Sequence, residues 1–227
     1  MSRTKLKDRQ LPDYTKGEEL FNMISHIVGG AFAIAALVLC VIMAVAKGSA
    51  WGVVGGAIYG ATMILLYAMS SIYHGLKPEM AKKVFQVIDH CTIYFLIAGT
   101  YTPIMLAALR PSYPVYAWVI FGVVWGCAAV AVTLTAIDLN RFKVFSMICY
   151  LAMGWCIIIF IRPTLEVLTT GGTVLLLLGG VAYTIGSILY AIGKKHRYMH
   201  SIFHLFVLAG SILHFFMILF YVMPVKG

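Results

Sequence analysis

The sequence predicts an all-α, polytopic membrane protein, a bundle of seven transmembrane helices with the N-terminus cytoplasmic and the C-terminus outside. Three observations lead to this fold class. First, hydrophobic residues make up 62% of the 227 residues and charged residues only 11%, whereas soluble domains average about 25% charged residues. Second, the hydrophobic residues fall in runs of the length that crosses a bilayer, about 20 residues. Third, lysine and arginine gather in alternate loops between those runs.

Seven apolar runs are long enough to form a spanning helix. None alternates polar and apolar residues in the way that strands of a membrane β-barrel do. The runs cover residues 23–46, 52–75, 84–108, 115–137, 143–161, 173–193 and 199–223. Residues 1–20 are therefore predicted to form a cytoplasmic tail, and residues 21–227 a single seven-helix transmembrane domain.

Local signals accompany several of these runs. Thr15 followed by Glu18 is typical of a capping box that opens the first helix. Glycines recur every four residues from Gly52 to Gly60 in the second run and predict a face for close helix packing. Pro103 predicts a kink in the third run. The fourth to sixth runs are identified by their length and by the charged loops beside them, and the seventh follows a basic loop.

The distribution of basic residues predicts the orientation. When the seven runs are threaded through a bilayer, thirteen of the seventeen lysines and arginines lie on one side. The other side holds only Lys47, Arg110, Arg162 and Lys226. Because an excess of Lys and Arg marks the cytoplasmic side, the tail is predicted to lie inside the cell. The net charge of +9 then reflects topology and contact with anionic headgroups rather than binding to nucleic acid.

Four ionisable residues in or beside the spans are predicted to lie at a similar depth. Such residues are costly in a membrane and usually mark a functional site. With a helix rise of about 1.5 Å per residue, His74 lies about 4–5 Å from the cytoplasmic end of its helix and Asp89 about 9 Å. His200 and His204 lie about 4–11 Å from theirs. Three helices that are distant in sequence thus agree in depth, which predicts one shared site.

The residue types at this depth favour a metal site. His200 and His204 are four residues apart and project from one helix face, a spacing that can supply two ligands to one metal. His74 would complete a three-histidine set, and a water would take the fourth position, as in catalytic zinc sites. Imidazoles without a thiolate favour zinc. Asp89 could hold that water and act as a base, and Ser70, one turn before His74, could orient the water or polarise a substrate carbonyl.

Simpler interpretations remain open for the same residues. His200 and His204 could bond to headgroups or backbone at the membrane interface. Asp89 could pair with Lys83 or with a histidine. Ser70 could be a small residue at a helix contact.

The remaining histidines are expected to lie apart from such a site. His90 is about 100° around the helix from Asp89, and His196 is expected to be solvated in a loop. His214 lies about 15 Å beyond His204 along the helix axis and is expected to form a hydrogen bond inside the bundle. His26 shares a helix face with Glu19 and Asn22, and this face is expected either to support the site or to contact headgroups.

Taken in order, these motifs resemble those of a known family. They are Glu19-x-x-Asn22-x-x-Ser25-His26, Ser70-x-x-x-His74, Asp89, and His200-x-x-x-His204 with the later His214. The set resembles the bacterial hemolysin III family, within the superfamily of progestin and adipoQ receptors that includes the adiponectin receptors. The resemblance implies a zinc ion on His74, His200 and His204, a water held by Asp89, and Ser70 beside the site. It also implies a multi-pass protein of a bacterial cytoplasmic (inner) membrane.

The resemblance suggests two functions and makes a third less favoured. The superfamily includes membrane ceramidases, so the chain is expected to be a zinc-dependent hydrolase of a membrane lipid amide or ester. The alternative is a receptor or membrane-state sensor with a structural zinc ion. A pore-forming cytolysin or an ion or proton carrier is disfavoured, since a water-filled path needs polar residues through the midplane. Membrane lipids are the expected partners, without nucleic acid or a soluble protein, and a homo-oligomer remains open.

Overall fold

The computed structural model describes residues 3–193 and 196–225, and all its regular elements in these ranges are helical. The α-helices are α1 (Lys16–Ala46), α2 (Ala50–Gly75), α3 (Glu79–Pro103), α4 (Pro114–Ile137), α5 (Lys143–Trp155), α6 (Ile161–Ile192) and α7 (Met199–Met217). Short 3-10 helices are η1 (Leu6–Asp8) and η3 (Cys156–Phe160), and π-helical segments are η2 (Ile104–Leu109) and η5 (Ile218–Val222). Lys194, Lys195 and Lys226, which contribute to the predicted charge asymmetry, lie outside the described residues.

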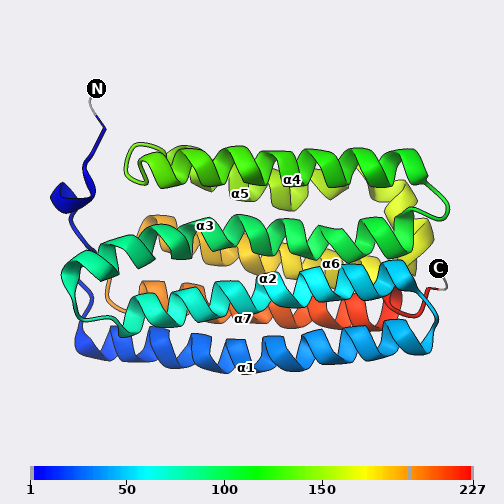
Figure 1. Cartoon of the computed structure of the whole chain (residues 1–227), viewed down its shortest axis with the longest axis horizontal. Coiled ribbons are helices and arrows are strands. Elements are labelled where there is room, and N and C mark those ends of the chain that lie inside the picture. The colour runs from blue at the N-terminus through cyan, green and yellow to red at the C-terminus, as the bar shows by residue number, and fades with distance from the viewer. Residues whose placement is uncertain (1–2, 194–195, 226–227) are drawn as a thin grey trace.

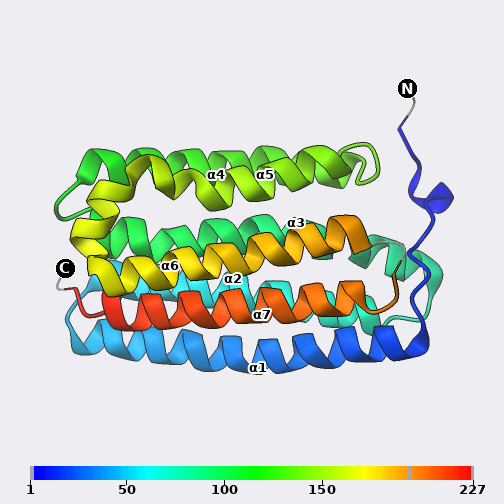
Figure 2. The same cartoon turned by 180° about the vertical axis from the view of Figure 1, so that it is seen from behind.

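The predicted all-α membrane fold is confirmed. By length and hydropathy, six helices among the described residues could cross a membrane, because residues 143–192 count as one 50-residue stretch. Figure 2 shows that this stretch runs along the bundle as α5, turns at one end and returns as α6. The number of spans and the orientation of the termini stay predictions.

The helices lie side by side in layers (Figures 1 and 2). α1 packs on α2 and α7, α3 packs on α2 and α4, and α6 packs on α7. The helix α3 is central: 83% of its most apolar stretch is buried, against 28% for α1 and α4. The outer faces of α1, α4 and α6 instead expose large apolar side chains such as Ile42, Val123 and Ile188. An apolar surface of this extent is suited to lipid.

The predicted local signals appear in the structure. The Thr15 hydroxyl accepts a hydrogen bond from the Glu18 N–H at 3.2 Å, and the Glu18 carboxylate accepts the Thr15 N–H at 2.8 Å. This capping box fixes the start of α1 at Lys16, before the apolar run begins. Gly60 lies against Leu37 of α1, so closely that a Cβ at Gly60 would stand 2.3 Å from the Leu37 Cβ.

Pro103 marks a change of helix type rather than a break. The α-helix α3 ends at Pro103 and the chain continues as the π-helical segment η2, because proline lacks the N–H that an α-helical hydrogen bond requires. The same residue packs on α2, where a Cβ at Gly55 would lie 2.7 Å from the Pro103 Cα. The change of helix type therefore falls at a site of close helix contact.

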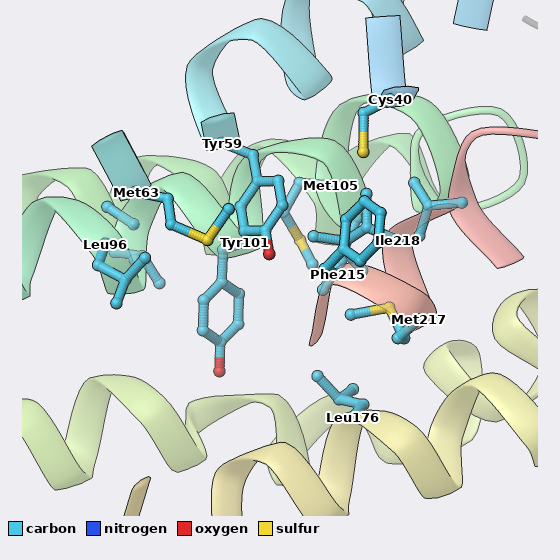
Figure 3. Close-up of a cluster of buried hydrophobic side chains, with 14 of the residues drawn as sticks. Cys40, Tyr59, Met63, Leu96, Tyr101, Met105, Leu176, Phe215, Met217 and Ile218 are labelled. Atoms are coloured by element: carbon cyan, nitrogen blue, oxygen red, sulfur yellow. The ribbon is translucent and has the colours of Figure 1, made fainter. Parts of the chain in front are cut away.

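The hydrophobic core fills the bundle away from the N-terminal end of α1. Figure 3 shows Tyr59 of α2, Met105 of η2 and Phe215 of α7 meeting in this core. Tyr59 and Met105 are fully buried. The packed core holds α2, α3 and α7 in fixed register, and these are the helices that carry the predicted site residues.

Candidate metal centre

The end of α2 and the start of α7 lie at the end of the bundle where α1 begins (Figure 1). Three imidazoles converge there. His74 lies in the last turn of α2, and His200 and His204 lie in the first turns of α7. His200 Nε2 is 3.3 Å from His74 Nε2 and 3.1 Å from His204 Nε2. The structure therefore brings together the three histidines that the sequence predicts as ligands, and their nitrogens could hold one metal ion.

The nitrogen spacing fits a tetrahedral zinc ion. Two nitrogens at 2.0–2.1 Å from such an ion stand about 3.3 Å apart. His74 Nδ1 donates to the Glu19 carboxylate at 2.6 Å, which leaves Nε2 as the His74 nitrogen available to a metal ion.

A carboxylate and an ammonium group support His74 from behind. Glu19 of α1 bonds His74 Nδ1 through one oxygen and Lys82 Nζ of α3 through the other, at 2.6 and 2.8 Å. Lys82 also donates to the carbonyl oxygens of His74 and Leu76 at the end of α2, at 3.4 and 3.2 Å. Glu19, His74 and Lys82 thus connect α1, α2 and α3 beside the ligand nitrogens.

The same face of α1 also contacts α7. The Asn22 side-chain oxygen accepts a hydrogen bond from Ser201 at 2.7 Å. Ser25 Oγ lies 3.5 Å from His204 Nδ1. The ring of His26 stacks on that of His204 with centroids 3.7 Å apart, and His26 is buried. The face of α1 that carries Glu19, Asn22 and His26 therefore supports the site, as one of the two alternatives predicted, and does not face the headgroups.

Asp89 and Ser70 are buried beside the histidine cluster but are not part of it. Asp89 interacts electrostatically with His74, and His90 Nδ1 is 3.9 Å from its Oδ2 atom. The Ser70 hydroxyl is buried without a hydrogen-bond partner among the described residues. The alternative in which Asp89 pairs with Lys83 is wrong. Lys83 instead pairs with Glu79 at 2.6 Å, one turn before it on α3.

The remaining histidines largely follow expectation. His90 donates through Nδ1 to the Gln86 carbonyl oxygen at 2.8 Å. His196 is exposed between α6 and α7. His214 is buried and donates through Nε2 to the Leu176 carbonyl oxygen at 3.0 Å, which confirms the interior hydrogen bond. None of the three belongs to the metal cluster among the described residues.

Two cavities meet at the candidate centre. The first is apolar, has a volume of about 130 Å³, and runs from Asp89 and His200 to Ile104 and Ile157 between α3, α5, α6 and α7. The second is more polar and lies between the N-terminal segment and the loop after α4. Both are lined by His200 and Tyr190, so the candidate ligand His200 stands between an apolar and a polar compartment.

The N-terminal segment crosses the end of the bundle and covers the site. Tyr14 stacks on His200, with ring centroids 5.0 Å apart and planes 16° apart. Burial raises the pKa of Tyr14, so its phenol keeps its proton. Further back, Arg9 is buried and donates to the Gln86 side chain at 2.6 Å, and the Lys7 carbonyl accepts from Lys83 at 2.9 Å. Residues 3–15 are therefore docked on the bundle, and they form what is called the N-terminal strap below.

Tyr14 and Lys82 are site residues that the sequence reasoning missed. Tyr14 directly precedes the capping box, and an aromatic residue at this position is the one signal in the sequence that the segment packs on the bundle. In the sequence, Lys82 is only one of the basic residues that predict the orientation. A lysine three residues after the start of a helix gives no hint that it reaches a carboxylate on α1.

Comparisons with known proteins agree with these observations. The model of the family described as haemolysin-III related matches residues 14–215. Hemolysin-3 of Bacillus cereus is 41% identical over 207 residues, which cover 91% of this chain and 93% of that protein. The hemolysin-3 homolog of Bacillus subtilis (strain 168) is 40% identical over 212 residues, 93% of this chain and 98% of that protein.

A more distant similarity reaches a human protein. The monocyte to macrophage differentiation factor of Homo sapiens is 27% identical over 179 residues, which cover 74% of this chain and 70% of that protein. The match fits the predicted superfamily.

Proposed function

The chain belongs to the haemolysin-III-related family, and from this premise we propose that it is a zinc-dependent hydrolase that cleaves an amide or ester bond in a membrane lipid. The proposal places it in a bacterial cytoplasmic membrane with seven spans and the N-terminus inside, as the basic residues predict. The observation that carries it is the convergence of three imidazoles, one of which, His200, lines an apolar cavity.

The residues present suit a catalytic zinc site. His74, His200 and His204 would hold the ion and leave the fourth tetrahedral position open, as catalytic zinc sites do. Zinc would act as a Lewis acid there and would activate water near neutral pH. The residues of the chain would do the rest: the Asp89 carboxylate would hold the attacking water and accept its proton, and the Ser70 hydroxyl would donate to the substrate carbonyl oxygen.

The two cavities suit a lipid with one apolar and one polar part. An acyl chain would occupy the apolar cavity between Asp89 and Ile157. The polar part of the lipid would lie in the compartment beneath the N-terminal strap. The bond to be cleaved would then lie beside His200, the ligand that both compartments share.

Metal analysis combined with a lipid assay tests the proposal. We expect purified protein to contain about one zinc per chain, as a single three-histidine site requires, and to release free fatty acid from ceramide or from an acyl ester in mixed micelles. His200→Ala should lose both the metal and the release, and Asp89→Asn should keep the metal and lose the release. Cys127→Ala is the control, because Cys127 is an exposed potential metal ligand on α4 that lies outside the cluster and lines neither cavity.

A structural zinc ion in a receptor or sensor is the second candidate. The observation in its favour is that the three histidines join α2 to α7, as a structural ion would. Under this alternative, chelation lowers the melting temperature, while no lipid of the panel is cleaved by metal-loaded protein. The absence of bound metal from well-folded wild-type protein would contradict both candidates.

A further inference from the structure

Glu19 forms a short hydrogen bond to His74 Nδ1 that the proposed reaction does not use. It comes from α1, a helix that supplies none of the three clustered imidazoles. Its side chain is 20% exposed, while the side chain of its partner His74 is fully buried. The 2.6 Å distance between Glu19 Oε2 and His74 Nδ1 is that of a charge-assisted hydrogen bond.

We propose that Glu19 is a positioning residue for the metal: it holds the His74 Nδ1–H so that the Nε2 lone pair faces the ion. The inference rests on the proposed zinc site. Metal-binding histidines commonly donate their second N–H to a carboxylate, which fixes the tautomer and the ring orientation and raises the basicity of the ligand nitrogen. Here the geometry of α1 and α2 supplies that contact for one ligand.

Within the described part of the chain, the other two ligands have no charged partner at Nδ1. His204 Nδ1 is 3.5 Å from Ser25 Oγ, at the outer limit of a hydrogen bond. His200 Nδ1 is buried without a hydrogen-bond partner among the described residues. His74 alone is held by a charged group, and it is the only one of the three ligands that does not lie on α7.

Lys82 keeps Glu19 in place and moderates its charge. Its ammonium group is 2.8 Å from the second oxygen of Glu19, and it also binds the end of α2. Removal of Lys82 would remove the positive charge that partly neutralises the Glu19 carboxylate. The carboxylate would then interact more strongly with His74. Glu19 and Lys82 should consequently differ in their effects on metal affinity, although both stabilise the same helix junction.

Competition with a chromophoric chelator on the full-length protein in detergent tests the assignment. Glu19→Gln keeps the shape and removes the charge, and we expect about 10- to 100-fold weaker zinc binding, the usual effect of losing such a partner. Lys82→Met should bind zinc as tightly as wild type or more tightly. Glu79→Gln is the control, since Glu79 is a 73% exposed glutamate paired with Lys83 at 2.6 Å.

A spectroscopic measurement separates positioning from stability. Protein loaded with Co²⁺ should show the visible absorption of a tetrahedral site, and its bands should shift in Glu19→Gln but not in Glu79→Gln. Equal weakening of zinc binding in Glu19→Gln and Lys82→Met, with unshifted bands, would mean that the junction is merely structural and would overturn the assignment. Tight zinc binding by Glu19→Gln would overturn it while leaving the proposed function intact. A wild-type protein without stoichiometric metal would overturn both.

Discussion

The phenol of Tyr14 lies nearly parallel to the imidazole of His200, with the ring centroids 5.0 Å apart. Tyr14 precedes α1, whereas His200 is in the first turn of α7. The contact therefore joins the N-terminal strap to a candidate metal ligand. The same phenol is 5.9 Å from the ring of His74, so one side chain covers two of the three imidazoles.

This contact predicts that Tyr14 slows metal exchange. In Tyr14→Ala the covering ring is lost, and we expect zinc to leave about 2- to 10-fold faster, since an aromatic contact contributes about 0.5–1.5 kcal/mol. The measurement is the rate of zinc transfer to excess chelator, followed by absorbance. Tyr14→Phe keeps the ring and should exchange like wild type. A Tyr14→Ala rate equal to that of Tyr14→Phe would show that the ring does not cover the ion.

The docking of the strap should depend on pH through Asp138. The pKa of Asp138 lies below its usual value because its carboxylate accepts hydrogen bonds, chiefly from the Thr4 N–H and also from the N–H groups of Arg141 and Asn140. The Thr4 hydrogen bond is 2.7 Å long. A lowered folded-state pKa gives stabilisation that is present above the ordinary value of about 3.9 and is lost as the pH falls through the folded-state pKa. We expect the strap to undock in that acidic range.

Hydrogen–deuterium exchange of residues 3–15, corrected for intrinsic rates, measures this undocking. Wild type should be protected at pH 6 and lose protection at an acidic pH below the lowered pKa of Asp138. Asp138→Asn should show weak protection at either pH. Asp8→Asn, in an exposed part of the strap, should behave like wild type. Equal protection of the wild type at both pH values would refute the role of Asp138.

A close helix contact predicts a large effect at one glycine. A Cβ at Gly60 would stand 2.3 Å from the Leu37 Cβ and 2.7 Å from the Leu37 Cα, so α1 and α2 would have to separate. We expect Gly60→Ala to destabilise the protein by about 1–3 kcal/mol, the cost of overpacking, and to lower its melting temperature in detergent. Gly122→Ala is the control, because nothing lies within 4 Å of a Cβ there. Equal melting temperatures for the two variants would contradict close packing at Gly60.

The sequence predicts those parts of this structure that repeat along one helix. Run length predicts the membrane helices, the spacing of Thr15 and Glu18 predicts the start of α1, and the four-residue spacing of His200 and His204 predicts a shared face. Helix depth then brings His74 to the same level. These inferences use only the rise and periodicity of a helix, which a sequence contains.

Contacts between helices were harder to predict because rotation about each helix axis is not written in the sequence. Within α3, by contrast, periodicity explains why Lys83 pairs with Glu79 four residues earlier rather than with Asp89 six residues later. The link from Glu19 through His74 to Lys82 requires the packing of three helices. The docking of Tyr14 requires a chain path outside any helix, for which no periodic signal exists.

The apolar cavity predicts a substitution that separates lipid binding from metal binding. Val207 lines the cavity and is buried, three residues after His204 on α7. In Val207→Phe the larger ring would fill space that the proposed acyl chain needs. We expect release of fatty acid from a long-chain lipid to fall more than about tenfold, which corresponds to about 1.4 kcal/mol in activation free energy. The zinc content should stay at the wild-type level.

Val181→Phe is the matched control, since Val181 lies on α6 with 42% of its surface exposed. The same substitution there adds a ring outside the core, so turnover and zinc content should both stay at wild-type levels. A short-chain lipid sharpens the comparison, because it needs less of the cavity and should lose less activity in Val207→Phe. If long-chain and short-chain lipids lost activity equally while zinc stayed bound, the cavity would not be the acyl-chain site, and the lipid would have to reach His200 from the polar compartment instead.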